Sequence, residues 1–349
     1  MTGRHIATIG AGGNIGSHLV PHLGRLPGIE RVTLVDPDNY ERRNLWSQDI
    51  TPGAIGRSKA RVQARRLQRI NPQLRVEAIA SAVEDVPLGR LRCDLILACL
   101  DSRRARQTVN EVAWRLGIPW IDAGVLGAQL LARVNVYDPA PDGPCLECAW
   151  SQTDYEAIEQ EYPCAGGSGA PRPSDSPSAL GALAASLLAI ECQKLLAGDD
   201  GCAANGSQVT IDARWRQLHV TNFRRRAGCR FDHRRWELAP LACRLGEFTI
   251  GQALELGGGL RVMGHRFIEA LMCPGCGWSE PQRRLRLNRP ASRCPVCGRR
   301  LVPLGFPLDQ LDSKLPAESR GRTLAQAGIA GGDVLSVDGK HYEILAEAA

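Results

Sequence analysis

The sequence lacks several features that would each place a protein in a broad class. It has no large charge excess, since 43 Lys and Arg stand against 37 Asp and Glu, so composition alone does not indicate nucleic-acid binding. The first residues lead directly into a predicted strand, and we therefore expect no signal peptide. The longest uncharged helical run, between Asp175 and Glu191, is too short and too interrupted by Pro and Ser to cross a bilayer. We expect neither a membrane nor nucleic acid as a partner.

Complete disulfide pairing is also not indicated, because the 13 cysteines are odd in number. Many of them fall in C-x-x-C pairs, which begin at Cys145, Cys273 and Cys294. This spacing favours thiolate metal sites in a reducing compartment over disulfides. We therefore expect a cytoplasmic protein.

The order of predicted elements indicates the fold of the larger domain, which we place at residues 1–240 of the 349. Strands are predicted at residues 6–9, 31–35, 76–79, 94–100, 120–123 and 129–137, with helices at about 17–25, 58–70 and 103–116. This alternation predicts an α/β fold with a Rossmann-like, doubly wound, mostly parallel sheet. A small-residue helix at 179–197, capped by Ser178 and closed by Gly198, and a hairpin at 208–223 are expected to follow.

A glycine-rich turn joins the first predicted strand to the first helix. Its glycines are Gly10, Gly12, Gly13 and Gly16, and the next strand ends at Asp36. Glycines let the backbone approach a phosphate, and a helix start offers unpaired N–H groups and a positive dipole end. Asp36 stands where a ribose hydroxyl is bound in such folds. The strict G-x-G-x-x-G spacing is not met, because Ile15 takes the third glycine place, so the turn alone fits a nicotinamide dehydrogenase or no ligand equally well.

Further motifs follow the turn in a fixed order. They are Asp36-Pro37-Asp38, Asn44-Leu45-Trp46-Ser47-Gln48, Gly56-Arg57-Ser58-Lys59 and Cys99-Leu100-Asp101-Ser102. Together with the turn they resemble the ThiF-type adenylyltransferases, whose pattern is a glycine loop, D-x-D, N-L-x-R-Q, G-x-x-K and a strand ending in Asp. That superfamily includes molybdopterin-synthase adenylyltransferases, thiamine-biosynthesis relatives and ubiquitin-activating enzymes. Order and spacing match over about residues 6–226, which disfavours a nicotinamide oxidoreductase.

The resemblance implies a reaction in which a carboxylate attacks the α-phosphate of ATP, giving an acyl-adenylate and pyrophosphate. The implied substrate is the C-terminal glycine carboxylate of a ubiquitin-like protein or, as the alternative, of a sulfur carrier for thiamine, molybdopterin or thiolated tRNA. Lys59 is the candidate cation for the phosphates, and Asp101 the candidate ligand of Mg²⁺ or its water. The resemblance also implies that Asp36 holds the ribose of ATP, with Asp38, Asn44 and Gln48 in the same pocket. Without the motifs, Lys59 reads as an exposed helix lysine and Asp101 as a helix cap.

The sequence departs from the family pattern at two cations. The family arginine of N-L-x-R-Q is Ser47 here, and we find no counterpart of the arginine segment that precedes the glycine strand and reaches the partner subunit's site. The replacement stays open among Arg42, Arg43, Arg103, Arg104 and Arg106. A homodimer is implied by the resemblance, and the missing segment weakens that inference. The missing cations also leave a catalytically dead nucleotide-binding scaffold as an alternative from another class of function.

A first zinc site is predicted around Cys145 and Cys148, whose spacing supplies half of a tetrahedral set of ligands. In the ThiF-type relatives a second C-x-x-C follows the late hairpin, and the matching place here holds Cys229-Arg230-Phe231-Asp232-His233. The resemblance therefore implies Cys229 and His233 as the remaining ligands, with Cys243 as the rival for the fourth. The alternative is a pair of buried free cysteines.

The C-terminal part, residues 241–349, contains a second metal signal. Cys273, Cys276, Cys294 and Cys297 form two C-x-x-C pairs separated by 17 residues, which fits a zinc ribbon and a second Zn²⁺. Residues 323–345 resemble the end of a ubiquitin-like β-grasp fold. The ribbon is rich in arginine, at Arg283, Arg284, Arg286, Arg289, Arg293, Arg299 and Arg300. Because Trp278 is its only aromatic residue, a solvated face or a dock for an acidic protein is favoured over nucleic acid.

Cys164 is the candidate for a second chemical step. It lies between an acidic helix candidate at 154–161 and a Gly-, Ser- and Pro-rich run at 165–177, which is typical of a mobile loop. In ubiquitin-activating relatives, a cysteine at the matching place takes the acyl group from AMP as a thioester. A thiolate suits that step because it is a strong nucleophile and a good later leaving group. A conjugating enzyme would then be a partner, whereas the alternatives are a persulfide in sulfur transfer and an uninvolved loop cysteine.

Overall fold

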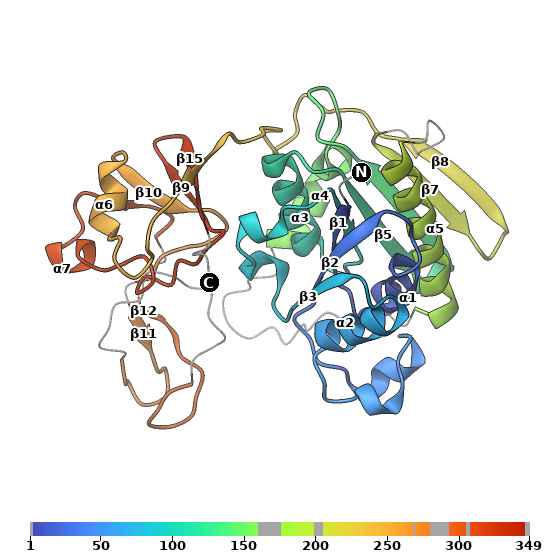
Figure 1. The fold of residues 1–349 in the computed structure, drawn as a ribbon, viewed down its shortest axis with the longest axis horizontal. Coiled ribbons are helices and arrows are strands. Elements are labelled where there is room, and N and C mark those ends of the chain that lie inside the picture. Colours follow the sequence, from blue (N-terminus) through green and yellow to red (C-terminus); the bar gives the residue numbers. More distant parts are fainter. Residues whose placement is uncertain are drawn as a thin grey trace. The chain divides into compact units, whose positions relative to one another are not determined.

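In the computed structural model the chain forms two compact units, one of residues 1–84 and 92–235 and the other of residues 85–91 and 236–349 (Figure 1). The structure describes residues 3–159, 176–198, 205–268, 270–279, 293–304 and 308–345. The division after Arg235 falls close to residue 240, where the sequence places a domain boundary. The segment 85–91, which belongs with the second unit, is not foreseen by the sequence.

The first unit is built on an eight-stranded sheet with the order β3-β2-β1-β4-β5-β6-β7-β8. Its strands are β1 (Arg4–Ile9), β2 (Ile29–Val35), β3 (Arg75–Ile79), β4 (Leu95–Ala98), β5 (Trp120–Leu126), β6 (Leu131–Tyr137), β7 (Ser207–Asp212) and β8 (Gln217–Asn222). Strands β1 to β5 are parallel, and β6, β7 and β8 continue the sheet antiparallel. The predicted Rossmann-like, doubly wound sheet is confirmed. Its strand order reverses between β1 and β4, and ligands of such sheets bind at that switch point.

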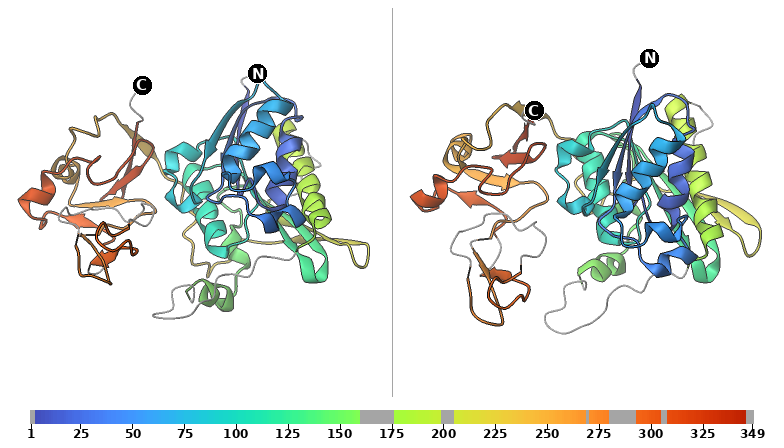
Figure 2. Two further views of the ribbon diagram at one scale, coloured as in Figure 1. Left: turned by 90° about the horizontal axis from the view of Figure 1, so that it is seen from below. Right: turned by 60° about the horizontal axis from the view of Figure 1, so that its bottom comes forward.

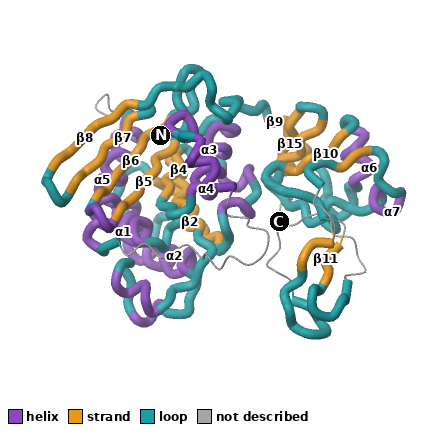
Figure 3. The backbone as a smooth tube through the Cα atoms, turned by 180° about the vertical axis from the view of Figure 1, so that it is seen from behind, coloured by secondary structure: helices purple, strands orange, loops and turns teal. Residues whose placement is uncertain are grey.

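Helices cover both faces of this sheet (Figures 1 and 3). Helices α1 (Asn14–Leu23), α2 (Lys59–Ile70) and α5 (Ser178–Ala197) pack on one face, and α3 (Arg103–Leu116) lies on the other. Alternate strand residues such as Leu97, Ile121 and Val134 meet Leu188 of α5 in one buried cluster. The residues between these, one step along each strand, therefore face α3. Helix α4 (Gln152–Glu159) covers much of the predicted acidic helix.

Helix α5 has 20 residues and is long and apolar enough to cross a membrane by length and composition alone. The uncharged run that we considered too short to cross a bilayer ends before Glu191, whereas the helix continues to Ala197. The expectation from the run is therefore corrected for the helix as a whole. Its buried residues, among them Ala184 and Leu188, pack into the core of the sheet. The helix ends at Gly198, as predicted, with φ of 66°. Ser178 is its first residue and not its cap, because the Ser178 hydroxyl contacts His18 Nε2 at 3.0 Å and Pro177 occupies the N-cap position.

Short 3₁₀ turns fill several connections. They are η1 (Arg42–Trp46), η2 (Pro52–Ala54), η3 (Val83–Asp85), η4 (Leu88–Leu91), η5 (Gly127–Gln129) and η6 (Leu146–Ala149). The first two lie between β2 and α2. Their segment is closed at its base by backbone hydrogen bonds between Tyr40 and both Gly56 and Arg57, at 2.8 and 2.9 Å. The N-L-x-R-Q-like motif therefore sits on a closed loop and not on a helix or strand.

The second unit, most of which is orange to red in Figure 2, is built on a five-stranded sheet with the order β13-β10-β14-β15-β9. Its strands are β9 (Leu238–Leu241), β10 (Gly259–Val262), β13 (Leu311–Asp312), β14 (Val334–Val337) and β15 (Lys340–Ile344), with helices α6 (Ile250–Glu255) and α7 (Ala317–Arg320). Ile250 and Ala253 of α6 pack with Leu260 and Leu335 in its core. A separate ribbon pairs β11 (Ala270–Met272) with β12 (Val302–Leu304). The predicted β-grasp resemblance of residues 323–345, which form β14 and β15, stays a prediction.

Candidate functional site

The predicted nucleotide residues follow strands whose carboxyl ends lie side by side. Val35 of β2 pairs with Ile9 of β1, Ile9 with Ala98 of β4, and Ala98 with Asp122 of β5. Asp36, the glycine turn and the segment that leads to Asp101 therefore share one edge of the sheet (Figure 1). This edge is where ligands bind in doubly wound folds.

The glycine turn needs its glycines at particular places. Gly10 has φ of +79°, and a Cβ on it would lie 2.4 Å from the Cys99 carbonyl oxygen. Gly16 lies within α1, where a Cβ would approach the Gly10 carbonyl oxygen to 2.1 Å. The glycine that comes one residue late in the motif therefore lets the helix pack directly beneath the turn.

Asp36 is buried at the end of β2 and fixes the turn. Its carboxylate accepts hydrogen bonds from the backbone N–H of Gly12 at 2.8 Å and of Asp38 at 3.1 Å. Burial raises the pKa of Asp36, and the Lys59 ammonium and the backbone donors oppose that shift only in part. Ribose binding by Asp36 stays a prediction. What the structure shows is a carboxylate that holds the glycine turn against the second strand.

Lys59 is the first residue of α2, which Ser58 caps by accepting a hydrogen bond from Arg61 N–H. Its side chain is buried against Gly12 of the turn, and its Nζ lies 3.0 Å from Asp38 Oδ2. The Nζ also lies 5.9 Å from the centre of the Tyr40 ring. The sequence motif therefore brings a cation to the turn, where its partner Asp38 is exposed and can give way to a phosphate.

The remaining predicted nucleotide residues differ in whether their polar groups have hydrogen-bond partners. Asp101 is exposed and has no hydrogen bond or ion pair with any residue that the structure describes. Asn44 uses its Oδ1 to accept from Glu41 N–H at 2.7 Å, within η1. Gln48 Oε1 is buried and has no partner within the described ranges. Asn14, which the sequence reading missed, has a buried Oδ1 in the same condition at the start of α1.

The arginines considered as replacements for Ser47 are mostly engaged. Arg43 pairs with Glu41 at 2.6 Å, Arg103 with Asp154 at 3.1 Å, and Arg106 with the buried Asp122 at 2.8 Å. Arg42 is exposed on η1. The sequence reading missed a further arginine at this edge, Arg133 of β6, which contacts the same Asp122 at 2.9 Å.

The first cysteine cluster brings together all four ligands that the sequence and the resemblance imply. Cys145 Sγ lies 3.8 Å from Cys148 Sγ and 3.7 Å from Cys229 Sγ, and Cys148 Sγ lies 3.2 Å from His233 Nε2. Zn–S bonds of about 2.3 Å in a tetrahedron place sulfur atoms about 3.8 Å apart, so the donor set fits Zn²⁺. The rival Cys243 packs against the core of the second unit instead.

Residues around this cluster hold its two halves together. Asn110 Oδ1 accepts a hydrogen bond from Leu146 N–H at 3.0 Å, inside the C-x-x-C turn. Arg115 pairs with Asp232 at 2.5 Å, and Trp114 stacks edge-on against His233. The hydrogen bond between the two thiols lowers the pKa of Cys148 and raises that of Cys145, so Cys148 is the thiolate of the pair.

The second cluster lies in the ribbon of the second unit. Cys273 Sγ lies 3.3 Å from Cys297 Sγ, and Cys276 Sγ lies 3.5 Å from Cys294 Sγ. All four sulfur atoms lie within 4.8 Å of one another. Each pair forms a tight turn, in which Gly277 N–H bonds to the Cys273 carbonyl oxygen and Gly298 N–H to that of Cys294. This set also fits a tetrahedral zinc ion, with Cys276 and Cys297 exposed.

Cys164 lies outside the described residues, but the elements on both sides of it are described. Before it, Asp154 of α4 pairs with Arg103, in the helix that follows Asp101. After it, the Ser176 carbonyl oxygen accepts a hydrogen bond at 3.0 Å from Asn14 Nδ2, in the first turn of α1. Both flanking elements are thus attached to the sheet edge that carries Asp36, the glycine turn and Asp101, which we call the nucleotide edge after its predicted ligand.

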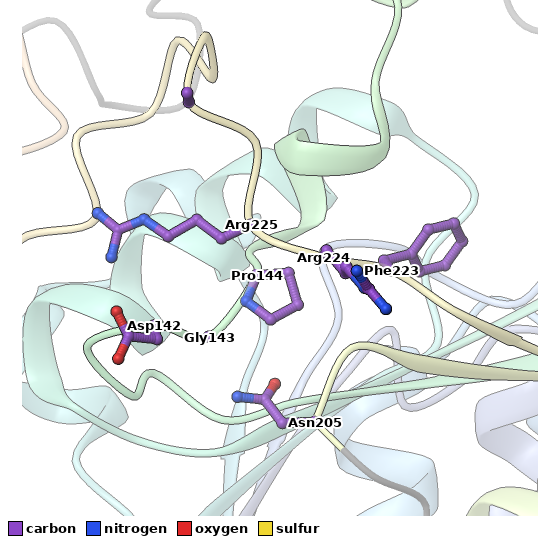
Figure 4. Close-up of a pocket in the computed structure, with 8 residues that line it drawn as sticks. Asp142, Gly143, Pro144, Asn205, Phe223, Arg224 and Arg225 are labelled. Atoms are coloured by element: carbon purple, nitrogen blue, oxygen red, sulfur yellow. The ribbon is translucent and has the colours of Figure 1, made fainter.

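A cavity of about 750 Å³ lies elsewhere in the first unit (Figure 4). Its lining combines Asp142, Gly143, Pro144, Asn205, Phe223, Arg224, Arg225 and Ala227. These residues follow β6, precede β7 or follow β8. Because β6 is antiparallel to β5 and its last residue pairs with Trp120, the cavity lies at the end of the sheet away from Asp36 and Asp101. It is therefore separate from the predicted nucleotide residues.

Comparisons with known proteins agree on the first unit. A sequence model described as the ThiF family matches residues 2–231. The chain is 29% identical over 180 residues to ubiquitin-like modifier-activating enzyme 5 of Oryza sativa subsp. japonica, covering 46% of this chain and 42% of that protein. It is 28% identical over 227 residues to the sulfur carrier protein ThiS adenylyltransferase of Escherichia coli (strain K12), covering 64% of this chain and 84% of that one. It thus spans less than half of the first relative and most of the second.

Among solved structures, the fold is similar to that of E. coli MccB. A crystal structure of MccB with ATP matches with a TM-score of 0.53 at 22% identity, covering 66% of each chain. A second one, with AMPCPP and MccA, matches with a TM-score of 0.52 at 23% identity, covering 65% of each chain. At this level of identity the likeness shows a shared fold.

Proposed function

The chain belongs to the ThiF family, and from that premise we propose that it transfers AMP from ATP to the C-terminal carboxylate of a small ubiquitin-like or sulfur-carrier protein. The observation that carries the proposal is the glycine turn with Asp36 and Lys59 packed against it and with Asp101 following the neighbouring strand β4. The dinucleotide-binding pattern consists of the glycines and one acidic residue for the ribose, and it includes neither a buried lysine nor a second carboxylate. The matches to a modifier-activating enzyme and to an adenylyltransferase support the same chemistry.

In the proposed reaction a carboxylate oxygen attacks the α-phosphorus of ATP. The bond to the oxygen that bridges to the β-phosphate breaks, and pyrophosphate leaves with that electron pair. The turn offers backbone N–H groups at the start of α1, and Lys59 offers a cation once a phosphate displaces Asp38. The free Asp101 carboxylate suits Mg²⁺, which prefers oxygen ligands and would neutralise phosphate charge. The chain's own part is to position the reactants and balance their charge.

We further propose that Cys164 takes the acyl group from the adenylate in a second step. Its thiolate would attack the acyl carbon, and AMP would leave as the C–O bond breaks, giving a thioester that a conjugating enzyme can accept. The support is the attachment of the flanking elements, through Asp154 to Arg103 and through Ser176 to Asn14. A thioester step fits the likeness to modifier-activating enzymes.

A sulfur-carrier substrate is the second candidate. It is favoured by the fact that the match covers 84% of the ThiS adenylyltransferase but 42% of the modifier-activating enzyme. In that case Cys164 would form no thioester with the carrier. The zinc ions proposed for the two cysteine clusters are structural in either case, because each site has four protein ligands and no open position.

The experiment is ATP–pyrophosphate exchange with purified protein and a panel of carriers, among them E. coli ThiS and other β-grasp proteins that end in Gly-Gly. We expect exchange with a carrier that has a free C-terminal carboxylate and none when that carboxylate is converted to an amide. A thiol-sensitive adduct in addition indicates the modifier-activating route, and exchange without one indicates sulfur-carrier adenylation. AMPCPP binding without exchange for any carrier would instead identify a nucleotide-binding scaffold.

A further inference from the structure

A buried carboxylate bridges two arginines beside the nucleotide edge. Asp122 of β5 is fully buried, and its Oδ1 accepts a hydrogen bond from Arg106 Nε at 2.8 Å. Its Oδ2 lies 2.9 Å from Arg133 Nη1. Two guanidinium groups and one carboxylate leave a net charge of +1 in this cluster. Removing several charged groups from water costs free energy, so we asked what function could explain this buried cluster.

The two arginines are held to different degrees. Arg106 also donates to the Leu100 carbonyl oxygen and, at 3.5 Å, to that of Ala123, and 13% of its side chain is exposed. It therefore ties the ends of β4 and β5 together just before Asp101. Arg133 is 30% exposed, and its Nη1 donates a hydrogen bond to Asn135 Oδ1 at 2.7 Å. The same Nη1 lies 2.9 Å from Asp122 Oδ2, which is a charge contact and not a hydrogen bond. The Nε and Nη2 of Arg133 have no hydrogen-bond partner within the described residues.

The pairing of β4, β5 and β6 places Arg133 on the same edge of the sheet as the predicted nucleotide residues. β4 ends at Ala98, which pairs with Asp122, and Arg133 pairs with Gly124, one full strand repeat further out. Two residues of a strand span about 7 Å, so the Arg133 backbone lies beyond the end of β4. The order along the edge is Asp36 after β2, the turn after β1, Asp101 after β4, and then Arg133 on β6.

A glycine makes room for the Arg133 side chain. A Cβ on Gly124 would lie 3.1 Å from Arg133 Nε and 3.2 Å from Nη2. The guanidinium therefore lies flat across the neighbouring strand, on the α3 face of the sheet. Its unpartnered edge presents two N–H directions, the geometry that suits a carboxylate.

We propose that Arg133 binds the C-terminal carboxylate of the incoming carrier and holds it beside the α-phosphate of ATP. Carboxylate and triphosphate repel each other, and a cation between them is needed before they can react. Ser47 stands where the family pattern has an arginine, so that position supplies no cation. Asp122 and Arg106 fix Arg133 and do not themselves touch the substrate. This inference rests on the proposed adenylation and deepens it.

The test is binding of a minimal carboxylate, so that it does not depend on knowing the carrier. Glycylglycine is titrated into the full chain loaded with AMPCPP, and binding is followed by saturation-transfer NMR, with glycylglycinamide as the ligand control. We expect the wild type to bind the free carboxylate and not the amide. Arg133→Gln should weaken glycylglycine binding about ten- to hundredfold, the usual range for a charge-assisted hydrogen bond. AMPCPP binding should weaken less than glycylglycine binding does, because Arg133 is proposed to contact the carboxylate and not the phosphates.

Further variants separate binding from folding. Arg133→Gln leaves Asp122 paired with Arg106, so no buried charge loses its partner and the variant should keep the wild-type unfolding temperature. Arg133→Lys keeps the positive charge but lacks the two parallel N–H donors of a guanidinium group. This variant should therefore bind glycylglycine less tightly than wild type. Arg75→Gln, an exposed arginine at the start of β3 and the far edge of the sheet, is the matched control and should bind normally.

Specific outcomes overturn the proposal. Equal glycylglycine binding by wild type and Arg133→Gln would remove Arg133 from the site, as would wild-type binding of the amide or no wild-type binding of either ligand. If the proposed adenylation itself is wrong, the wild type will show no carrier-dependent pyrophosphate exchange, which is a different measurement from glycylglycine binding. Such a result can coexist with Arg133-dependent binding of glycylglycine, so the two failures are distinguishable.

Discussion

The nucleotide edge and the cysteine cluster of Cys145 lie in the same unit, but they are organised in opposite ways. At the nucleotide edge, polar groups are left without partners: Asp101 is exposed, and Gln48 Oε1 is buried and unpaired in the described structure. Burial also raises the pKa of Asp36, so its charged form is disfavoured there. In the cluster each ligand atom contacts another, and the hydrogen bond between Cys145 and Cys148 lowers the pKa of Cys148 while it raises that of Cys145.

The difference teaches how to tell a substrate site from a structural one in this fold. Unsatisfied buried polar groups cost free energy, and they are tolerated where a ligand will complete them. A closed set of four donors has no such vacancy and can only hold the chain together. The nucleotide edge should therefore respond to mutation through activity, and the cysteine clusters through stability.

The largest effect is expected in the ribbon, where few apolar residues support the cysteines. Cys273, Cys294 and Leu301 form its small buried cluster. Structural zinc contributes about 10–16 kcal/mol to the folding of such small sites, so Cys273→Ser should release one of two zinc ions per chain and unfold the ribbon. Metal analysis and hydrogen exchange of β11 and β12 measure this, with β1 to β8 unchanged. Cys243→Ser is the control and should retain both ions, since Cys243 packs in the core of the second unit.

A smaller loss of stability is expected in the first cluster, because the surrounding fold holds its halves together. Cys229→Ser should release the other zinc ion and destabilise the first unit by about 4 kcal/mol, as loss of a metal site does. The contacts of Arg115 with Asp232 and of Asn110 with Leu146 should keep the unit folded. Thermal unfolding with metal analysis is the measurement. A variant that keeps two zinc ions per chain would show that Cys229 is not a ligand.

The reverse pattern is expected at the nucleotide edge. Lys59→Ala and Asp101→Asn should each lower carrier-dependent pyrophosphate exchange about 10²- to 10³-fold, the usual cost of removing one charge-stabilising group. Both variants should retain two zinc ions, and Asp101→Asn should unfold at the wild-type temperature because Asp101 is exposed and has no partner within the described residues. Near-normal exchange by either variant would remove that residue from the site.

Local signals explain why most of the fold could be predicted from the sequence. Helix α3 begins and ends where its cap Ser102 and the left-handed Gly117 predict. The C-x-x-C pairs likewise predict their turns. Long-range placement needs more than local signals: the family resemblance implies His233 as a ligand, and in the structure it lies beside Cys148, with the Arg115–Asp232 pair next to it.

The arginine cluster at the edge shows what the sequence could not reveal. Arg106, Asp122 and Arg133 come from α3, β5 and β6, and only the strand register brings them together. Ser178 carries a cap signal, yet its hydroxyl contacts His18 from another helix, so a tertiary contact overrode a local preference. Cys164, the proposed acyl acceptor, falls outside the described residues and stays a prediction.

The smallest effect expected is the pH dependence that comes from the raised pKa of Asp36. Because its pKa in the folded chain is above the ordinary 3.8, the folded state keeps a proton that the unfolded chain releases. Stability is therefore favoured at low pH and falls as the pH rises from 3.8 through the folded pKa. Asp36→Asn cannot ionise, and its Oδ1 can still accept the Gly12 N–H. The unfolding temperature of this variant, relative to wild type, should thus rise between about pH 4 and pH 7. Thermal unfolding at a series of pH values measures it, and a flat or falling difference would mean that the nucleotide edge does not hold a disfavoured charge.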